Sequence, residues 1–242
     1  MIRFLRSVRK TVFFSFVLFF QLQAFSQTET FTNGSIIVNM GVTPQTVNNA
    51  LKPYGMIYDL MRNQKVPIKW VINPNKIKDG TDFTYNGRVY KGGPFIIPAA
   101  YRTTAVNTLM ASWVASSPGM DLDTVGATPL TVPVAATLNS VPRWTLDATN
   151  GGIAQGFLAA AGITNTGFSA GAYNWKLVAA LDCCDDFFVM PHADPTWATH
   201  NRLYTWNQQC LGAIWAGCHA VSALENAINP ANTTQQMNFL ST

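Results

Sequence analysis

Short apolar runs alternate with segments of helical periodicity along most of this chain. Ser35–Met40 is an apolar, β-branched run that stops at Gly41, and it predicts a buried strand. Val47–Asn63 has apolar residues at helical spacing, with Pro53 inside it as an expected kink or break. Ile68–Ile72 predicts the next strand. Strand, helix and strand in this order predict a βαβ unit with a right-handed crossover.

A β-hairpin is predicted next, because Asn86-Gly87 separates two short β-prone segments within Asp82–Lys91. We expect this hairpin to be inserted at the edge of the main sheet. Phe95–Pro98 predicts a third core strand, and Thr103–Ala115 predicts a helix with one apolar face.

The middle of the chain, Ser116–Asn150, is rich in Pro, Thr and Gly, and its pattern is weaker. It contains one expected strand at Leu130–Ala136 and another near Arg143–Leu146. Gly151–Ala161 predicts a short helix. Neither a repeat nor a charge run marks a domain boundary, so we expect one domain over residues 27–242.

The last part of the chain repeats the alternation of strand and helix. Phe187–Met190 and Gly212–Ala216 predict strands, and Thr196–Gln208 predicts the helix between them. A second helix is expected from His219 to about Asn229. Repeated alternation of this kind predicts an α/β fold with a mainly parallel sheet that is covered on both faces.

The site of such a sheet is expected at one edge, because ligands collect at the carboxyl ends of parallel strands. The turns after Met40, Met190 and Ala216 should therefore share one rim. All three histidines of the chain and two of its four cysteines lie within Asp185–Glu225, close to two of these turns. We predict the functional site at this rim.

Residues 1–26 predict a secretory signal peptide. A basic start is followed by the apolar run Val12–Phe20 and by a small-x-small cleavage pattern, Ala24-Phe25-Ser26, before Gln27. The apolar run is too short for a bilayer core of roughly 30 Å. We therefore expect export to the periplasm, the cell surface or the medium, with no membrane span after signal cleavage.

Removal of this signal changes the charge balance. Four of the 16 Lys and Arg residues lie in it, which leaves 12 against 12 Asp and Glu, so the mature chain is close to neutral. Nucleic-acid binding is excluded, since it needs a clustered basic face. A hydrophobic content of 48% with 12% charged residues fits a well-buried sheet protein. We expect no cofactor.

Four cysteines in an exported chain suggest a disulfide, for which three connectivities exist. Cys183 and Cys184 precede one predicted strand and Cys210 precedes the next, so these cysteines should share the amino-terminal edge of the sheet. Cys218 lies at the opposite edge. A bond from Cys183 or Cys184 to Cys210 is therefore expected, with Cys218 free. Four unpaired core cysteines are the alternative.

The segment Ala216–Ala220 reads small-x-Cys-x-small between an apolar strand and a helix. A nucleophile elbow needs small residues two before and two after the nucleophile, because the turn from strand to helix is sharp. The amino terminus of the following helix would activate the thiol of Cys218 and offer amides to a developing oxyanion. A buried structural cysteine is the alternative interpretation.

The segments DFFVMPHADPTW and GAIWAGCHAVSALE together resemble the class I glutamine amidotransferase-like superfamily, particularly its PfpI-type (intracellular-protease-like) branch. In that branch one strand ends in Pro-Gly-Gly and the next runs into Ala-x-Cys-His-Gly. The resemblance is good over Asp185–Glu225, weak over Ser35–Ile97 and absent in between. It implies a flavodoxin-like three-layer sandwich with Cys218 as nucleophile, and His219 matches the histidine that follows it.

The chain departs from this family pattern in ways that shape the expected site. Pro191-His192-Ala193 stands where the family has Pro-Gly-Gly, and Ala220 replaces the last glycine. The amidotransferase triad also needs a downstream histidine, and the 24 residues after Cys218 contain only the adjacent His219. We therefore expect the domain to be incomplete at its carboxyl end and to continue into a larger surface protein.

His192 is the candidate general base, because its turn and the elbow should lie at adjacent strand ends. Alternatively, it is a loop histidine bonded to Asp194 or to the backbone. His219 is expected to orient or pack within the elbow. The candidate substrate-pocket residues come from the three rim turns: Gly41, Ala193, Asp194, Gly217 and Ala220.

A metal site is a lesser alternative. His192, Asp194, His200, Cys218 and His219 include the residue types that bind zinc. However, H-x-D-x5-H is not an established ligand spacing, and His200 should lie on a helix. We expect no resident metal.

The leading functional hypothesis is a cysteine hydrolase or amidase that acts on an unknown small-molecule or peptide substrate. The alternative is a non-catalytic binding or assembly module at the amino terminus of a larger cell-surface protein. A metal-binding hydrolase is the third hypothesis.

Overall fold

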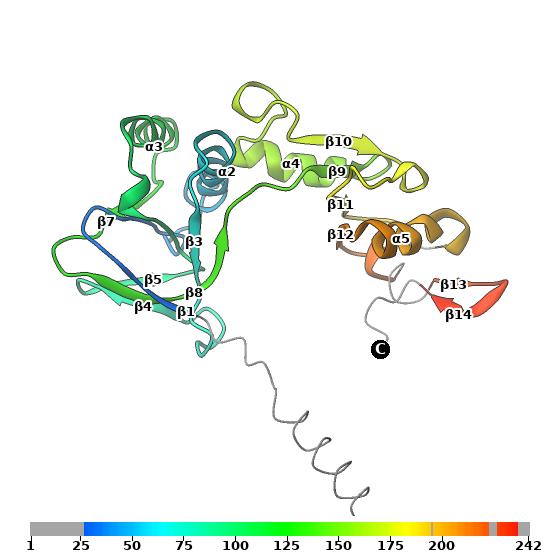
Figure 1. Cartoon of the computed structure of the whole chain (residues 1–242), viewed down its shortest axis with the longest axis horizontal. Coiled ribbons are helices and arrows are strands. Elements are labelled where there is room, and N and C mark those ends of the chain that lie inside the picture. Colours follow the sequence, from blue (N-terminus) through cyan, green and yellow to red (C-terminus); the bar gives the residue numbers. More distant parts are fainter. Residues whose placement is uncertain (1–26, 195, 223–226, 237–242) are drawn as a thin grey trace, which may run out of the picture.

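Two β-sheets of different kinds organise the chain (Figure 1). The computed structural model describes residues 27–194, 196–222 and 227–236, so the predicted signal peptide lies outside the described residues. One sheet has six antiparallel strands and the other has four parallel strands. The fold is therefore mixed α/β. No helix in these three ranges has the length and apolar character needed to span a membrane.

The six-stranded sheet contains most of the strands predicted in the first half of the chain. Its order is β1-β8-β3-β6-β2-β7. In that order the strands are β1 (Gln27–Phe31), β8 (Leu130–Leu138), β3 (Ile68–Val71), β6 (Phe95–Ile97), β2 (Ile36–Val38) and β7 (Leu122–Thr124).

Helices connect these strands on one side of the sheet. A short helical turn, η1 (Val47–Leu51), leads into α2 (Lys52–Gln64). Pro53 stands in the first turn of α2, where a missing N–H is tolerated, so the segment divides there as expected. A second turn, η2 (Ala99–Tyr101), precedes α3 (Thr104–Ser116).

The expectation of a mainly parallel sheet is wrong for this half of the chain. β2 and β3 run in the same direction, but β6 lies between them and is antiparallel to both. The succession β2-α2-β3-β6-α3-β7 is a split β-α-β-β-α-β arrangement of the ferredoxin-like type. An apolar run predicts a buried strand but carries no information about its direction, so the sequence could not reveal the inserted strand.

Both faces of this sheet carry buried residues. Ile36 and Val38 pack under α2 and α3, whereas Ile37 faces the opposite side. The opposite side is covered by a hairpin of β4 (Thr81–Tyr85) and β5 (Arg88–Lys91). Its turn has φ values of 48° at Asn86 and 78° at Gly87, as the sequence predicts. The hairpin pairs only with itself and packs on the sheet face, not at its edge.

The parallel sheet has the order β10-β9-β11-β12. Its strands, in sequence order, are β9 (Trp144–Asp147), β10 (Tyr173–Lys176), β11 (Phe187–Met190) and β12 (Ala213–Ala216). The strands predicted at Phe187–Met190 and Gly212–Ala216 are therefore confirmed as β11 and β12, and they are direct neighbours.

Helices cover both faces of the parallel sheet. Phe188 packs against α5 (Trp197–Cys210) on one face, and Val189 faces α4 (Gly152–Ala161) on the other. Short 3₁₀ turns, η3 (Gly167–Ser169) and η4 (Val178–Ala180), lie in the connections.

The predicted last helix is shorter than expected. Helical structure begins at Ala220 and is described to Ser222, and residues 223–226 lie outside the described residues. The expected end near Asn229 is wrong, because Ile228–Asn229 forms β13 and pairs with β14 (Asn232–Gln236).

Helix α2 belongs to both cores. Met56 and Leu60 are fully buried against the six-stranded sheet. Tyr58, on another side of the same helix, stacks on Trp144 of the parallel sheet at a centroid distance of 5.3 Å. At Gly55 the helix approaches α4 so closely that a Cβ would lie 1.9 Å from the carbonyl oxygen of Ala161. A single helix therefore joins the two sheets.

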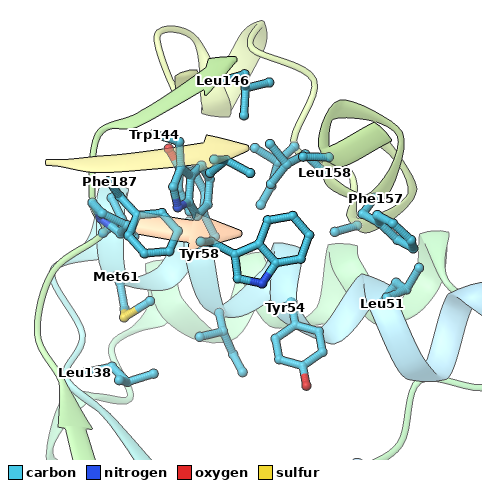
Figure 2. A pocket seen from close by; sticks show the side chains of 18 of the residues that line it. Leu51, Tyr54, Tyr58, Met61, Leu138, Trp144, Leu146, Phe157, Leu158 and Phe187 are labelled. Carbon is cyan, nitrogen blue, oxygen red and sulfur yellow. The ribbon is translucent and has the colours of Figure 1, made fainter. Parts of the chain in front are cut away.

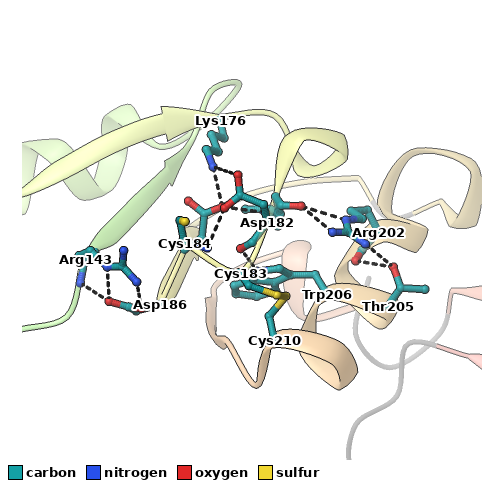
Figure 3. The surroundings of a disulfide bond; sticks show 12 residues. Arg143, Lys176, Asp182, Cys183, Cys184, Asp186, Arg202, Thr205, Trp206 and Cys210 are labelled. Carbon is teal, nitrogen blue, oxygen red and sulfur yellow. Dashed lines mark hydrogen bonds and ion pairs between the residues drawn. A yellow bond between two sulfur atoms is a disulfide. The ribbon is translucent and has the colours of Figure 1, made fainter.

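A disulfide links Cys183 to Cys210 at the amino-terminal edge of the parallel sheet (Figure 3). This is one of the two pairings expected from the sequence. Cys184 and Cys218 are free and exposed. The indole N–H of the fully buried Trp206 donates to the main-chain oxygen of Asp182 at 2.8 Å. The disulfide therefore closes a turn that the hydrogen bond from Trp206 already holds against α5.

Asp185 anchors the same turn. Its burial alone would raise the pKa of the carboxyl group, but the amide of Asp182, the Lys176 ammonium and the Thr145 hydroxyl all donate to it. These donors outweigh the burial, and the pKa of Asp185 lies below its usual range.

We expect the disulfide to contribute about 3 kcal/mol to the free energy of unfolding of the parallel-sheet half, because it closes a loop of 27 residues. The double variant Cys183→Ser/Cys210→Ser should show this loss in urea unfolding followed by tryptophan fluorescence. Cys184→Ser, a change at an exposed free thiol, should stay within about 0.5 kcal/mol of the parent. Equal midpoints for the double variant and this control would contradict a structural role of the bond.

Candidate functional site

Three loops meet at the carboxyl-terminal edge of the parallel sheet. They follow β9, β11 and β12, which are adjacent in the sheet. The order reverses between β9 and β11, and such a switch point is where ligands bind in doubly wound sheets. The predicted rim is therefore present, with one correction. The turn after Met40 belongs to the six-stranded sheet, and the loop after Asp147 takes its place.

The turn at Cys218 is sharp and left-handed. Cys218 has φ = 50°, a left-handed conformation that is unfavourable for a residue with a side chain. The amide of Ala220 donates to the oxygen of Gly217 at 3.0 Å, and that of Val221 to the oxygen of Cys218 at 3.2 Å, as the helix begins. A sharp turn of this kind presents the central side chain above the strand end.

Space beside Cys218 is limited. A Cβ on Gly217 would lie 3.0 Å from the carbonyl oxygen of Pro191 in the neighbouring loop. Ala220 is fully buried in the core beside α5. Of these two candidate pocket residues, Gly217 therefore packs against the neighbouring loop, and Ala220 packs in the core beneath the turn.

The side chains of His192, Cys218 and His219 converge. One donor atom from each lies within 4.8 Å of the others. The two imidazole centroids are 5.3 Å apart, and Nδ1 of His219 lies 3.5 Å from Oδ1 of Asp194. Cys218 and His219 are exposed, and His192 is half-buried. The structure thus brings together the three residues predicted as catalytic, at an open surface.

The other predicted site residues are distributed differently. Ala193 is buried in the core beside α5, whereas the side chain of Asp194 is 90% exposed. Gly41 follows β2 in the other sheet, where a Cβ would lie 3.0 Å from Lys91 of the hairpin. His200 is buried on α5 with Nδ1 3.3 Å from the oxygen of Thr196, so it is not part of the cluster.

Asp147 is a rim residue that the sequence did not reveal. It is buried at the end of β9, and its carboxylate accepts the amides of Thr149 and Asn150 at 3.3 and 3.2 Å. Gly151 follows, and a Cβ there would lie 2.5 Å from the oxygen of Asp147. Asn150-Gly151 after this strand indicates a loop in the sequence, but only the strand order places that loop at the rim.

A separate apolar pocket of about 560 Å³ lies between α2 and the α4 side of the parallel sheet (Figure 2). Its lining carries no charged side chain and is rich in aromatic rings, among them Tyr54, Tyr58, Trp144, Phe157 and Trp215. The side chains of Cys218, His192 and His219 are not part of it. The apolar pocket and the polar cluster are therefore different sites.

No family model matches this chain, and neither the curated proteins nor the solved structures yielded a match. The resemblance to the glutamine amidotransferase-like superfamily therefore stays a prediction.

The left-handed conformation of Cys218 leads to a prediction about stability. At ordinary positions glycine is less stable than alanine by roughly 0.5–1 kcal/mol, but glycine adopts positive φ without cost. We therefore expect Cys218→Gly to be more stable than Cys218→Ala by about 1 kcal/mol in urea unfolding. The reverse order, with alanine more stable, would mean that residue 218 is not held in the left-handed conformation.

Proposed function

We propose that the chain carries a cysteine-nucleophile site that hydrolyses an amide or related carbonyl compound. The observation that carries this proposal is the convergence of His192 and His219 on Cys218, which sits in a left-handed turn at the end of β12. A non-glycine residue held at positive φ costs of order 1–3 kcal/mol, and such strain is concentrated at functional sites.

His192 would act as the general base. Its donor atom lies within 4.8 Å of the sulfur, and such contacts often tighten when substrate binds. The imidazole accepts the thiol proton, and the sulfur attacks the carbonyl carbon. The main-chain N–H of His219, the residue after the nucleophile, would donate to the developing oxyanion.

The remaining steps follow from the same residues. The carbon–nitrogen bond breaks, and His192 returns the proton to the leaving amine. Water then hydrolyses the thioester and releases the thiol of Cys218. Asp194, 3.5 Å from Nδ1 of His219, would hold that ring in place beside the sulfur.

A flavodoxin-like, amidotransferase-like fold for the second half of the chain is part of this proposal. The parallel strands, numbered in sequence order, lie in the order 2-1-3-4, which matches the first four strands of the 2-1-3-4-5 doubly wound order. We also propose that the protein is exported. The Cys183–Cys210 disulfide supports this, since such bonds persist mainly in oxidising compartments.

The proposal is tested by assaying ammonia and amine release from a panel of primary amides and short peptides. Cys218→Ser should abolish turnover, and His192→Asn should lower kcat by about 10²- to 10⁴-fold, because general-base catalysis supplies that much. Cys184→Ser, which removes the other free thiol, should keep the parent rate. Full activity in Cys218→Ser would refute the mechanism.

The apolar pocket favours a second function, the binding of an uncharged apolar molecule. Its volume of about 560 Å³ falls within the range of small-molecule sites, and its lining offers rings but no charge. Phe157 and Trp215 lie at the pocket and are 60% and 44% exposed, so apolar surface there is open to a ligand. This observation supports the binding-module alternative and does not involve Cys218.

Titration with an apolar naphthalene dye tests this second function. Phe157→Asp should weaken dye binding at least about tenfold, because it places a charge in an apolar lining. Ile77→Asp, at a side chain that is 82% exposed and outside the pocket, should have no effect. Equal dye affinity in both variants would exclude the pocket as a ligand site.

A further inference from the structure

We propose that His192, Cys218 and His219 form a binding site for a zinc ion. Their donor atoms, two imidazole nitrogens and one thiol sulfur, lie within 4.8 Å of one another. Nitrogen and sulfur are the donors that zinc prefers. This inference depends on the position of the donors and not on the proposed hydrolysis.

Modest side-chain rotations would bring these donors to binding distance. With zinc bonds of about 2.0–2.3 Å, tetrahedral ligands lie roughly 3.5 Å apart, which is within the 4.8 Å limit that these donor atoms meet. Cys218 and His219 are exposed, so their side chains can rotate without disturbing the core. Their backbones are fixed by the strand ends of β11 and β12, which pair in register from Phe187 to Met190.

Asp194 provides the outer support that zinc-binding histidines usually have. Its Oδ1 lies 3.5 Å from Nδ1 of His219. With Nδ1 turned to a carboxylate, Nε2 is the nitrogen left for a metal, and the carboxylate makes it a better donor. Three protein ligands leave the fourth position for water or a second molecule, as in zinc sites that are not purely structural.

The other thiols and the remaining histidine do not compete for this role. Cys183 and Cys210 are bonded to each other, and His200 is buried on α5. Within residues 27–194, 196–222 and 227–236, the group of His, Cys, Asp or Glu side chains close enough to share an ion consists of His192, Cys218 and His219. Cys184 is exposed at the opposite edge of the sheet and serves as a matched control.

Zinc binding would have two chemical consequences. The thiol of Cys218 loses its proton when the metal–sulfur bond forms, so the affinity should fall as the pH is lowered. The bound sulfur would no longer be free to attack an electrophile. Zinc would also join the loop after β11 to the elbow after β12.

The experiment is a zinc titration of the metal-free protein in competition with a chromophoric chelator. We expect one zinc ion per chain in the parent protein and in Cys184→Ser. Asp194→Asn should weaken binding roughly tenfold, the low end of typical outer-shell effects. Cys218→Ser and His192→Ala should each weaken it by more than Asp194→Asn does. Circular dichroism of each variant establishes that it is folded.

Cobalt substitution provides a readout specific to the thiol. Cobalt(II) in the parent protein should give a thiolate-to-metal charge-transfer band that is absent in Cys218→Ser and retained in Cys184→Ser. Parent-like zinc affinity in folded Cys218→Ser, or loss of binding in Cys184→Ser, would overturn the inference. Amide hydrolysis without stoichiometric zinc binding would overturn this inference alone. Zinc binding without thiol-dependent hydrolysis would support it and refute only the proposed function.

Discussion

The fold depends on one helix that is packed from two sides. Met56 and Leu60 of α2 complete the core of the antiparallel sheet, while Tyr58 reaches the core of the parallel sheet. The close approach at Gly55 leaves no room for a side chain against α4. On a third side the carboxylate of Asp59 is buried and accepts the indole N–H of Trp113 at 3.0 Å. Because one helix serves both cores, each sheet is positioned relative to the other through α2.

This arrangement separates the chemical features of the chain. The apolar pocket lies beside α2, where the two halves meet, and it is lined by residues of both. The polar cluster lies at the carboxyl-terminal edge of the parallel sheet, and the disulfide fixes the amino-terminal edge. Pairing of Cys183 with Cys210 also keeps Cys218 out of the disulfide, so a free thiol remains at the rim where ligands are expected.

Local patterns predicted much of the second half of the chain. The strands Phe187–Met190 and Ala213–Ala216 are short apolar runs that end in turns, and their adjacency follows from the helix between them. The sharp turn at Cys218 lies where small residues flank a cysteine between an apolar run and a helical segment, so its position could be predicted. The disulfide followed from the same reasoning, since strand direction assigns each cysteine to an edge.

The first half was predicted less well, for a physical reason. β2 and β6 are buried on both faces, so their apolar runs do not show which way each strand runs or which strands are neighbours. Because β2 was expected in the parallel sheet, Gly41 was wrongly predicted to lie at the rim of that sheet. Asp147 was missed because its significance comes from its place at the switch point, which only the strand order reveals.

Thiol reactivity tests most directly whether the rim holds an activated cysteine. Brief iodoacetamide labelling of the metal-free native protein, mapped by mass spectrometry, compares Cys218 with Cys184 in the same molecule, and both are exposed. The structure predicts that Cys218 is alkylated faster near neutral pH and that His192→Asn removes most of the difference. If Cys218 reacts no faster than Cys184 in the parent protein, the elbow does not activate its thiol and the proposed site is wrong.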